Sequence, residues 1–239
     1  TPTPAPQIAR ISYPVAPASL DPARIGPLES AGNDLIGALF MPLASIAGDT
    51  GAIMPALARE IQAGDGGQRW TLSLRDDVFW MKFNPNTSQI EALRAVTADD
   101  VVFAARRACQ SNLAQSPVRA LFIIQGCIEL NEAAPGSLTD ERIASMFGVR
   151  YLNPTIIEFT LTAPAAYFPS ILTMPILTPL PAELLESEGE TWAAPDKIWA
   201  SGPFVPLPAA SDAEELTLVA NPNWSLERAG NVSIVQISF

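Results

Sequence analysis

Two pairs of adjacent carboxylates are the side chains in this sequence best suited to acid–base chemistry. They are Asp76 with Asp77, and Asp99 with Asp100. General acid–base catalysis needs carboxyl groups aimed at one substrate, whereas adjacent residues on a helix or strand point apart. Asp99 and Asp100 also follow Thr97, which predicts a helix start with an approximate capping box. The carboxylate pairs therefore favour structural roles over catalysis.

Histidine is missing from the 239 residues. Its absence excludes Ser-His-Asp and Cys-His catalysis and any histidine-ligated metal site. Neither G-x-x-x-x-G-K-[ST] nor G-x-G-x-x-G occurs, so the sequence shows no loop of the kind that cradles nucleotide phosphates. We therefore expect a protein that is not an enzyme and that carries no cofactor and no metal.

Cys109 and Cys127 are the only cysteines. Two thiols are too few for a four-ligand zinc site, so they are either free core thiols or one disulfide. The even count, together with an opening TPTPAP segment whose composition is typical of a tether, favours the disulfide. The bridge would stabilise the fold by about 3 kcal/mol in the chain-entropy treatment. Free thiols in a cytosolic protein are the alternative.

The chain is acidic, with 25 Asp and Glu against 14 Lys and Arg and a net charge of -11. An acidic surface keeps a protein soluble and monomeric, and it disfavours nucleic acid and anionic membranes as partners. Arg106 with Arg107 is the densest basic feature. We expect a monomer with no nucleic-acid partner.

Strands and helices alternate along the chain and would position these residues. Alternating apolar positions predict strands at residues 8–13, 70–74, 156–161, 216–220 and 232–237. Start signals and helical spacing predict helices at residues 30–39, capped by Ser30, at residues 97–108, and at residues 181–186. Gly202 is expected to allow a turn with positive φ. The mixture indicates a mixed α/β (α+β) fold.

Six short motifs occur in a characteristic order. They are LDP at residues 20–22, LFMPL at 39–43 with PALA at 55–58, WTLSLRDDVFW at 70–80, VTADDV at 96–101, SGPF at 201–204 and NPNW at 221–224. Each is weak alone, but the set spans nearly the whole chain. Together they resemble the family 5 extracellular solute-binding proteins, the group that binds oligopeptides, dipeptides and nickel. Nickel is the less favoured ligand here, because histidine is missing.

The resemblance implies a lobe of the type II periplasmic-binding-protein kind with an inserted subdomain. Residues 1–7 would be a tether, residues 8–40 and 164–239 a discontinuous lobe I, and residues 41–163 the subdomain. A second lobe would follow residue 239 and is missing from this chain. One departure from the family pattern is that residues 81–95 replace a short Asp-Gly turn, and a longer loop is expected there.

The implied function is that of a binding subunit of an ABC importer. It would capture a peptide or similar solute outside the membrane and deliver it to a permease. The location would be extracytoplasmic, in the periplasm or at the cell surface, with a lipid anchor on the full-length lipoprotein. A peptide-binding signalling receptor or a chaperone on the same fold is the alternative, because a fold does not fix a function.

The resemblance also implies which residues face the ligand. The loop after LDP would line the cleft and offer backbone groups to an extended peptide, and a second stretch would reach the cleft from the subdomain. These residues are Arg24, Ile25, Gly26, Pro27, Leu28, Val118 and Arg119. Arg75 could bind a ligand carboxylate, but a salt bridge with Asp99 or Asp100 is favoured.

Overall fold

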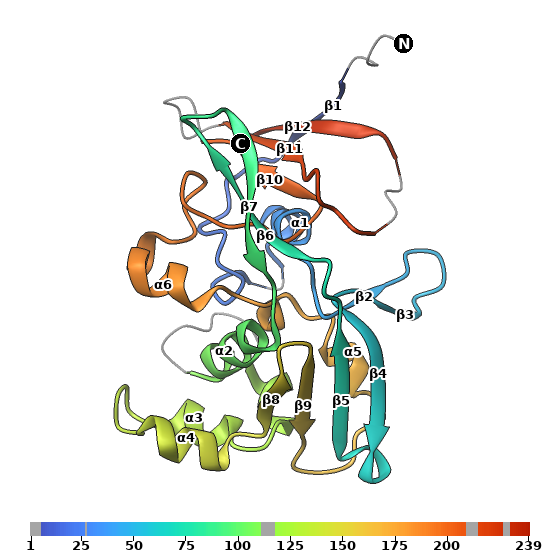
Figure 1. Ribbon diagram of the computed structural model, residues 1–239, viewed down its shortest axis with the longest axis vertical. Helices are drawn as coiled ribbons and strands as arrows, with labels where there is room; N and C mark the ends of the chain where they lie inside the picture. Colours follow the sequence, from blue (N-terminus) through green and yellow to red (C-terminus); the bar gives the residue numbers. More distant parts are fainter. Residues whose placement is uncertain (1–5, 27, 111–117, 209–214, 227–229) are drawn as a thin grey trace.

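Two four-stranded sheets lie toward opposite ends of an elongated molecule, with helices between and beside them (Figure 1). The computed structural model describes residues 6–26, 28–110, 118–208, 215–226 and 230–239. A continuous cluster of buried apolar side chains runs through both halves. The predicted mixed α/β fold is confirmed.

The upper sheet of Figure 1 joins the two ends of the described chain. Strand β1 (Gln7–Ser12) pairs in parallel with β12 (Val232–Ser238), which pairs antiparallel with β11 (Glu215–Ala220). Strand β10 (Phe204–Pro206) completes the sheet beside β11. The predicted strands at residues 8–13, 216–220 and 232–237 are thereby confirmed, with ends that differ by at most one residue.

Helix α1 (Ser30–Leu39) contacts β10 of this sheet, and its Leu35, Ile36 and Leu39 are buried. Its N-cap residue is Glu29, and no side chain caps the helix. The prediction that Ser30 is the cap is therefore wrong by one position, because Ser30 is already the first helical residue. The start of the helix is secured instead by the loop before it, where the Glu29 N–H donates to the Gly26 carbonyl at 3.1 Å.

Gly202 lies where the chain passes the end of α1, and its role differs from the predicted one. It is not among the glycines with positive φ. A Cβ atom at Gly202 would lie 2.6 Å from the backbone of Leu39 and of Phe40. The Gly202 N–H donates to the Leu39 carbonyl at 2.8 Å. Glycine is required here for close backbone approach, and not for a left-handed turn.

The lower sheet is fully antiparallel. Its order is β4 (Ala58–Gly64), β5 (Arg69–Leu74), β9 (Ile156–Thr160) and β8 (Val149–Asn153). The strand predicted at residues 70–74 is confirmed, and its Trp70, Leu72 and Leu74 are buried as its alternation indicates. Helix α2 (Ala98–Cys109) packs on β8 and β9.

Residues 81–95, expected to form a long loop, lie almost entirely in a β-hairpin. Strand β6 (Phe79–Asn84) pairs antiparallel with β7 (Gln89–Ala95), and only the residues between them turn. The buried Met81 exchanges two backbone hydrogen bonds with Ala200, at 2.7 and 2.9 Å. Docking of this apolar strand next to β10 stabilises an extended hairpin where a loop was expected.

The disulfide predicted between Cys109 and Cys127 is confirmed. It joins the last residue of α2 to the first residue of α3 (Cys127–Glu132), and both side chains are fully buried. The Asn131 side chain donates to the Cys109 carbonyl at 3.1 Å. Helix α4 (Asp140–Met146) follows, so the bridge fixes this small helical layer to α2.

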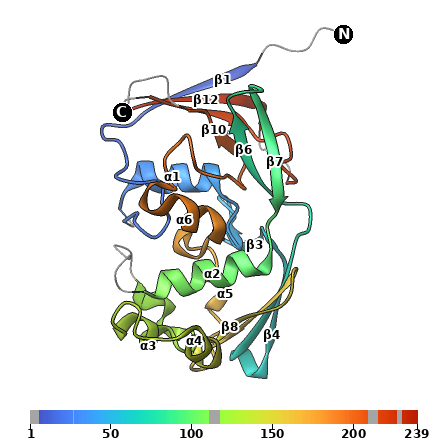
Figure 2. The same ribbon diagram turned by 60° about the vertical axis from the view of Figure 1, so that its left-hand side comes forward.

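The remaining elements are short. They are the β2–β3 pair (Ala44–Ile46 and Ile53–Pro55), α5 (Phe168–Ile171), α6 (Ala182–Glu188), and the 3-10 helices η1 (Asp65–Gly67), η2 (Val118–Ile123), η3 (Pro175–Leu177) and η4 (Gly189–Thr191). Figure 2 shows α6 between α1 and α2. Across the described ranges, no helix has the length and apolar character needed to cross a membrane.

Candidate functional site

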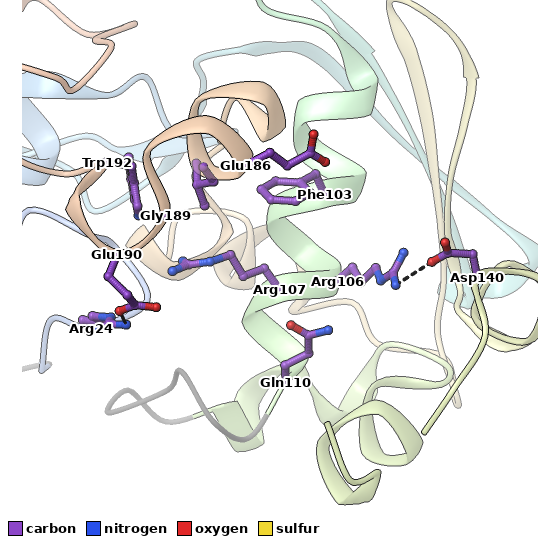
Figure 3. Close-up of a pocket in the computed structure, with 11 residues that line it drawn as sticks. Arg24, Phe103, Arg106, Arg107, Gln110, Asp140, Glu186, Gly189, Glu190 and Trp192 are labelled. Atoms are coloured by element: carbon purple, nitrogen blue, oxygen red, sulfur yellow. Dashed lines mark hydrogen bonds and ion pairs between the residues drawn. The ribbon is translucent and has the colours of Figure 1, made fainter. Parts of the chain in front are cut away.

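Helix α2 carries its charges in the order that its dipole favours. A capping box between Thr97 and Asp100 starts the helix, and the Thr97 N–H donates to the Asp100 carboxylate at 2.9 Å. Arg106 and Arg107 lie in the last turn, where the helix end is negative. Adjacent helical residues point in different directions. Arg107 therefore reaches toward the loop that begins with the LDP motif at residues 20–22 (the LDP loop), while Arg106 reaches toward α4 (Figure 3).

Arg107 forms a buried ion pair with Asp21 of the LDP loop. Its guanidinium donates to the two carboxylate oxygens at 2.8 and 2.5 Å. The Asp21 carboxylate also accepts the Ala23 N–H at 3.0 Å. On the other side, the guanidinium carbon of Arg107 lies 6.0 Å from the centre of the Trp192 ring. The pair therefore fixes the loop to α2 and satisfies both charges.

A pocket of about 570 Å³ opens beside this ion pair, between α2, α6, η4 and the LDP loop. Its charged lining residues are Arg24, Arg106, Arg107, Asp140, Glu186 and Glu190 (Figure 3). Phe103, Leu185 and Trp192 supply apolar surface. The arrangement suits a solute that has both a charged group and an apolar part.

The other two arginines of the pocket pair with exposed carboxylates. Arg24 pairs with Glu190 of η4, and the two side chains are 39% and 76% exposed. Arg106 donates to Asp140 at 2.8 Å, where the exposures are 35% and 82%. Exposed ion pairs contribute little to stability. Arg24 and Arg106 can therefore change partner in a way that the buried Arg107 cannot.

Of the residues predicted to face a ligand, Arg24 lines this pocket. Ile25 is buried and turns toward α1, where a Cβ atom on Gly32 would lie 2.7 Å from its side chain. The Gly26 carbonyl accepts from the Asn33 side chain at 3.0 Å and from the Glu29 N–H at 3.1 Å. The contacts of Ile25 and Gly26 thus secure the loop on α1.

The remaining predicted residues are Pro27, Leu28, Val118 and Arg119, and of these the described side chains of Leu28 and Arg119 do not line the pocket. Leu28 is 97% exposed, and Pro27 falls outside the described residues. Val118 is the first residue of η2, but its side chain is not among those described, and Arg119 is exposed. The structure therefore brings Arg24 into the pocket and does not bring Arg119 there with it.

The expected salt bridge of Arg75 with Asp99 or Asp100 is wrong. Arg75 donates to its near neighbour Asp77 at 2.9 and 2.7 Å, and this hydrogen bonding is the main reason that the pKa of Asp77 lies below its ordinary value. Asp100 is instead bound by Arg94 of β7, at 2.8 and 2.7 Å. The hairpin, which was not expected, supplies that partner.

Arg94 also connects the hairpin to α6. Besides Asp100, it binds both carboxylate oxygens of Glu183, one of them at 2.8 Å. The hydrogen bonds from Arg94 lower the pKa of Glu183. Hydrogen bonding to Asp100, followed by that to Glu183, raises the pKa of Arg94 further above its ordinary value. Since α6 lines the pocket, Arg94 helps to position one of its walls.

Sequence reasoning missed Asp21, Arg107, Glu190 and Trp192 as parts of this site. Arg106 with Arg107 and the Asp21 of the LDP motif are evident in the sequence, but no local pattern indicates that Arg107 and Asp21 form an ion pair. Within the described ranges, no group of three or more His, Cys, Asp or Glu side chains gathers as it would around a metal ion.

Known proteins resemble this chain over most of its length. Residues 52–239 match the family described as bacterial extracellular solute-binding proteins, family 5 middle. A probable deoxycholate-binding periplasmic protein of Escherichia coli, YgiS, is 28% identical over 94% of this chain and 38% of its own length. The oligopeptide-binding protein AliB of Streptococcus pneumoniae is 30% identical over 73% of this chain and 25% of its own.

Among solved structures, the peptide-bound OppA of Listeria monocytogenes superposes with a TM-score of 0.80 at 21% identity. The match covers 98% of this chain and 43% of that one. The predicted binding-protein fold is thus confirmed. The chain spans less than half the length of each of these relatives.

Proposed function

Because the chain belongs to the family 5 bacterial extracellular solute-binding proteins, we propose that it is part of a protein that captures a peptide or similar solute outside the membrane and delivers it to an ABC permease. The observation that carries this proposal is the charged and apolar pocket beside the LDP loop, whose wall includes Arg24. The relatives named above are binding proteins, which supports a role without catalysis.

The ligand-facing surface would comprise the loop of Arg24, Ile25, Gly26, Pro27 and Leu28, together with Val118 and Arg119 at the start of η2. Support comes from Arg24 in the pocket, from the nearly complete exposure of Leu28 and from the exposure of Arg119. Ile25 would act by holding the loop, since its side chain is buried. Main-chain recognition would tolerate varied peptide side chains.

The division into parts also stays a proposal. Residues 8–40 and 164–239 would form one lobe, residues 41–163 a subdomain, and residues 1–7 a tether. Apart from Gln7 at the start of β1, the strands of the upper sheet come from the first set and those of the lower sheet from the second, which favours the division. Hairpin β6–β7 belongs to the second set by sequence but contacts β10 of the upper sheet.

The ligand would carry a carboxylate. The names of the relatives point to oligopeptides in one case and to deoxycholate in the other. Both compounds present a carboxylate next to a less polar body, which matches the arginines and the apolar side chains of the pocket. The protein would work as a monomer at an extracytoplasmic location, with a lipid anchor on the full-length chain.

The test is native mass spectrometry of small molecules that co-purify with the full-length protein, followed by calorimetry with the compounds found. Peptides or carboxylate-bearing solutes that rebind at one site per protein are the expected result. Turnover of the bound compound, or co-purification of nothing but uncharged sugars, would contradict the proposal.

A further inference from the structure

The ion pair between Arg24 and Glu190 joins two different parts of the pocket wall. Arg24 follows the LDP turn, whereas Glu190 lies in η4 after α6. Glu190 is the more exposed partner, with three quarters of its side chain open to solvent. A pair of this kind contributes at most about 1 kcal/mol. A ligand group can therefore take the place of Glu190 at small cost.

Arg24 would keep its place if Glu190 left. Its backbone N–H donates to the Asp21 carbonyl at 2.9 Å, and its side-chain Nε lies 3.5 Å from the Asp21 carboxylate. Asp21 is itself fixed by the two hydrogen bonds from Arg107. Arg24 is thus a partly exposed cation whose position is held by Asp21 and Arg107. Such preorganisation strengthens binding of an anion.

Glu190 decides whether the pocket can offer the positive charge of Arg24 to a ligand. Arg107 is already neutralised by Asp21, which is not a lining residue, and Arg106 is paired with Asp140. Glu190 neutralises Arg24 in the same way. If Glu190 moves away, the Arg24 guanidinium presents its donors to the pocket and can bind a carboxylate with two hydrogen bonds.

Glu190 also lines a second pocket, of about 470 Å³, which is mainly apolar. Its walls include Ala16, Pro17, Leu20, Leu35, Ala193 and Phe239. The position that Glu190 occupies is therefore bordered by arginine on one side and by apolar surface on the other.

We propose that Glu190 occupies a carboxylate site on Arg24 and that the carboxylate of the bound solute displaces it. This inference rests on the proposed function and adds the residue that selects the solute: Arg24 binds the free carboxylate in the place that Glu190 leaves. Release of Glu190 upon binding would also free η4 from the LDP loop.

The test compares acids with their amides in isothermal calorimetry of the full-length protein. The probes are alanine peptides of two to five residues, each as the free acid and as the C-terminal amide, and deoxycholate with its neutral amide. The acid is expected to bind more tightly than the amide. In Arg24→Gln this acid–amide ratio should fall about tenfold, the amount expected for loss of charge-assisted hydrogen bonds.

Glu190→Gln should raise the acid–amide ratio, whereas Arg24→Gln should lower it. Removal of the competing carboxylate is expected to tighten acid binding by roughly two- to fivefold and to leave amide binding unchanged. A gain in affinity cannot result from misfolding. Glu186→Gln is the matched control, because it removes the same charge from the same pocket, and no ion pair of Glu186 occurs among the described residues.

The outcomes separate the two proposals. An acid–amide ratio that stays the same in Arg24→Gln, or equal effects of Glu190→Gln and Glu186→Gln, would overturn the role of Arg24 and Glu190 while leaving solute capture intact. No binding of any probe would overturn both. Binding of the peptides alone, or of deoxycholate alone, would identify the source of the carboxylate.

Discussion

Arg107 on α2 and Asp21 in the LDP loop form a bidentate ion pair whose side chains are only 10% and 2% exposed. The two residues are 86 positions apart in the sequence. Their contact joins a loop next to α1 to the helix that covers the lower sheet, so it links the two halves of the molecule. The pocket with Arg24 lies directly beside it.

Loss of Arg107 should be far more damaging than loss of its neighbour. Arg107→Leu leaves the Asp21 carboxylate buried and without its guanidinium, which is expected to cost about 3–5 kcal/mol of unfolding free energy. Arg106→Leu removes a partly exposed pair with Asp140 and should cost less than about 1 kcal/mol. Urea unfolding of the full-length protein, followed by tryptophan fluorescence, measures both.

The double variant Asp21→Leu with Arg107→Leu is the control. It removes both charges, so its loss of stability should be smaller than that of Arg107→Leu alone. Equal losses for Arg106→Leu and Arg107→Leu would contradict the assignment of Arg107 as the buried connection.

Removal of the disulfide should lower stability without changing the fold. The bridge joins residues 18 positions apart, and closing a loop of this size stabilises by about 3 kcal/mol. Cys109→Ala with Cys127→Ala should show this loss in urea unfolding, since alanine adds no polar group to the buried site. Addition of a reducing agent should lower the urea unfolding midpoint of the wild-type protein to that of the double variant. A wild-type midpoint that is insensitive to reduction would refute the prediction.

Local patterns predicted those elements whose signals lie within a few residues. Trp70, Leu72 and Leu74 alternate, and their strand forms with all three side chains buried. Thr97 and Asp100 are three positions apart, and their capping box forms at the predicted helix start. In both cases the pattern is set by backbone geometry, which is the same wherever the element packs.

Features that depend on distant contacts could not be predicted. Strand β6 pairs with β7 and, through Met81, with the distant Ala200, and the partner of Asp100 is Arg94 on that hairpin, not Arg75. The pocket also depends on contacts between distant residues, because Arg24 pairs with Glu190 of η4, which lies far along the chain. No periodicity encodes such pairings, so the sequence could predict Arg24 as a ligand-facing residue but could not indicate its partner Glu190.

Two glycine-to-alanine substitutions should change stability in opposite directions. Gly202→Ala places a Cβ atom 2.6 Å from the backbone of Leu39 and Phe40, which cannot move aside, and should cost about 1–3 kcal/mol. Gly37→Ala lies on the exposed side of α1 with nothing within 4 Å, and it should stabilise by up to about 1 kcal/mol. Thermal unfolding compares them, and stabilisation by Gly202→Ala would contradict the close approach.

The ion pair between Arg94 and Glu183 should make stability depend on pH in the acid range. Hydrogen bonds from Arg94 lower the pKa of Glu183 in the folded protein from its ordinary value of 4.5. The unfolded chain therefore binds this proton more readily, and the stabilisation is present above pH 4.5 and disappears as pH falls through the lowered pKa. Because the side chain is half exposed, we expect at most about 1 kcal/mol.

Glu183→Gln tests this sign. The variant should be less stable than wild type near neutral pH, and the difference should shrink as the pH falls from 4.5 through the lowered pKa, where first the unfolded and then the folded carboxylate becomes protonated. Glu186→Gln, one turn further along α6, is the matched control and should show no comparable pH-dependent difference. Thermal unfolding midpoints measured across this range decide the question, because a difference that grows toward low pH would show that Arg94 does not favour the ionised form of Glu183.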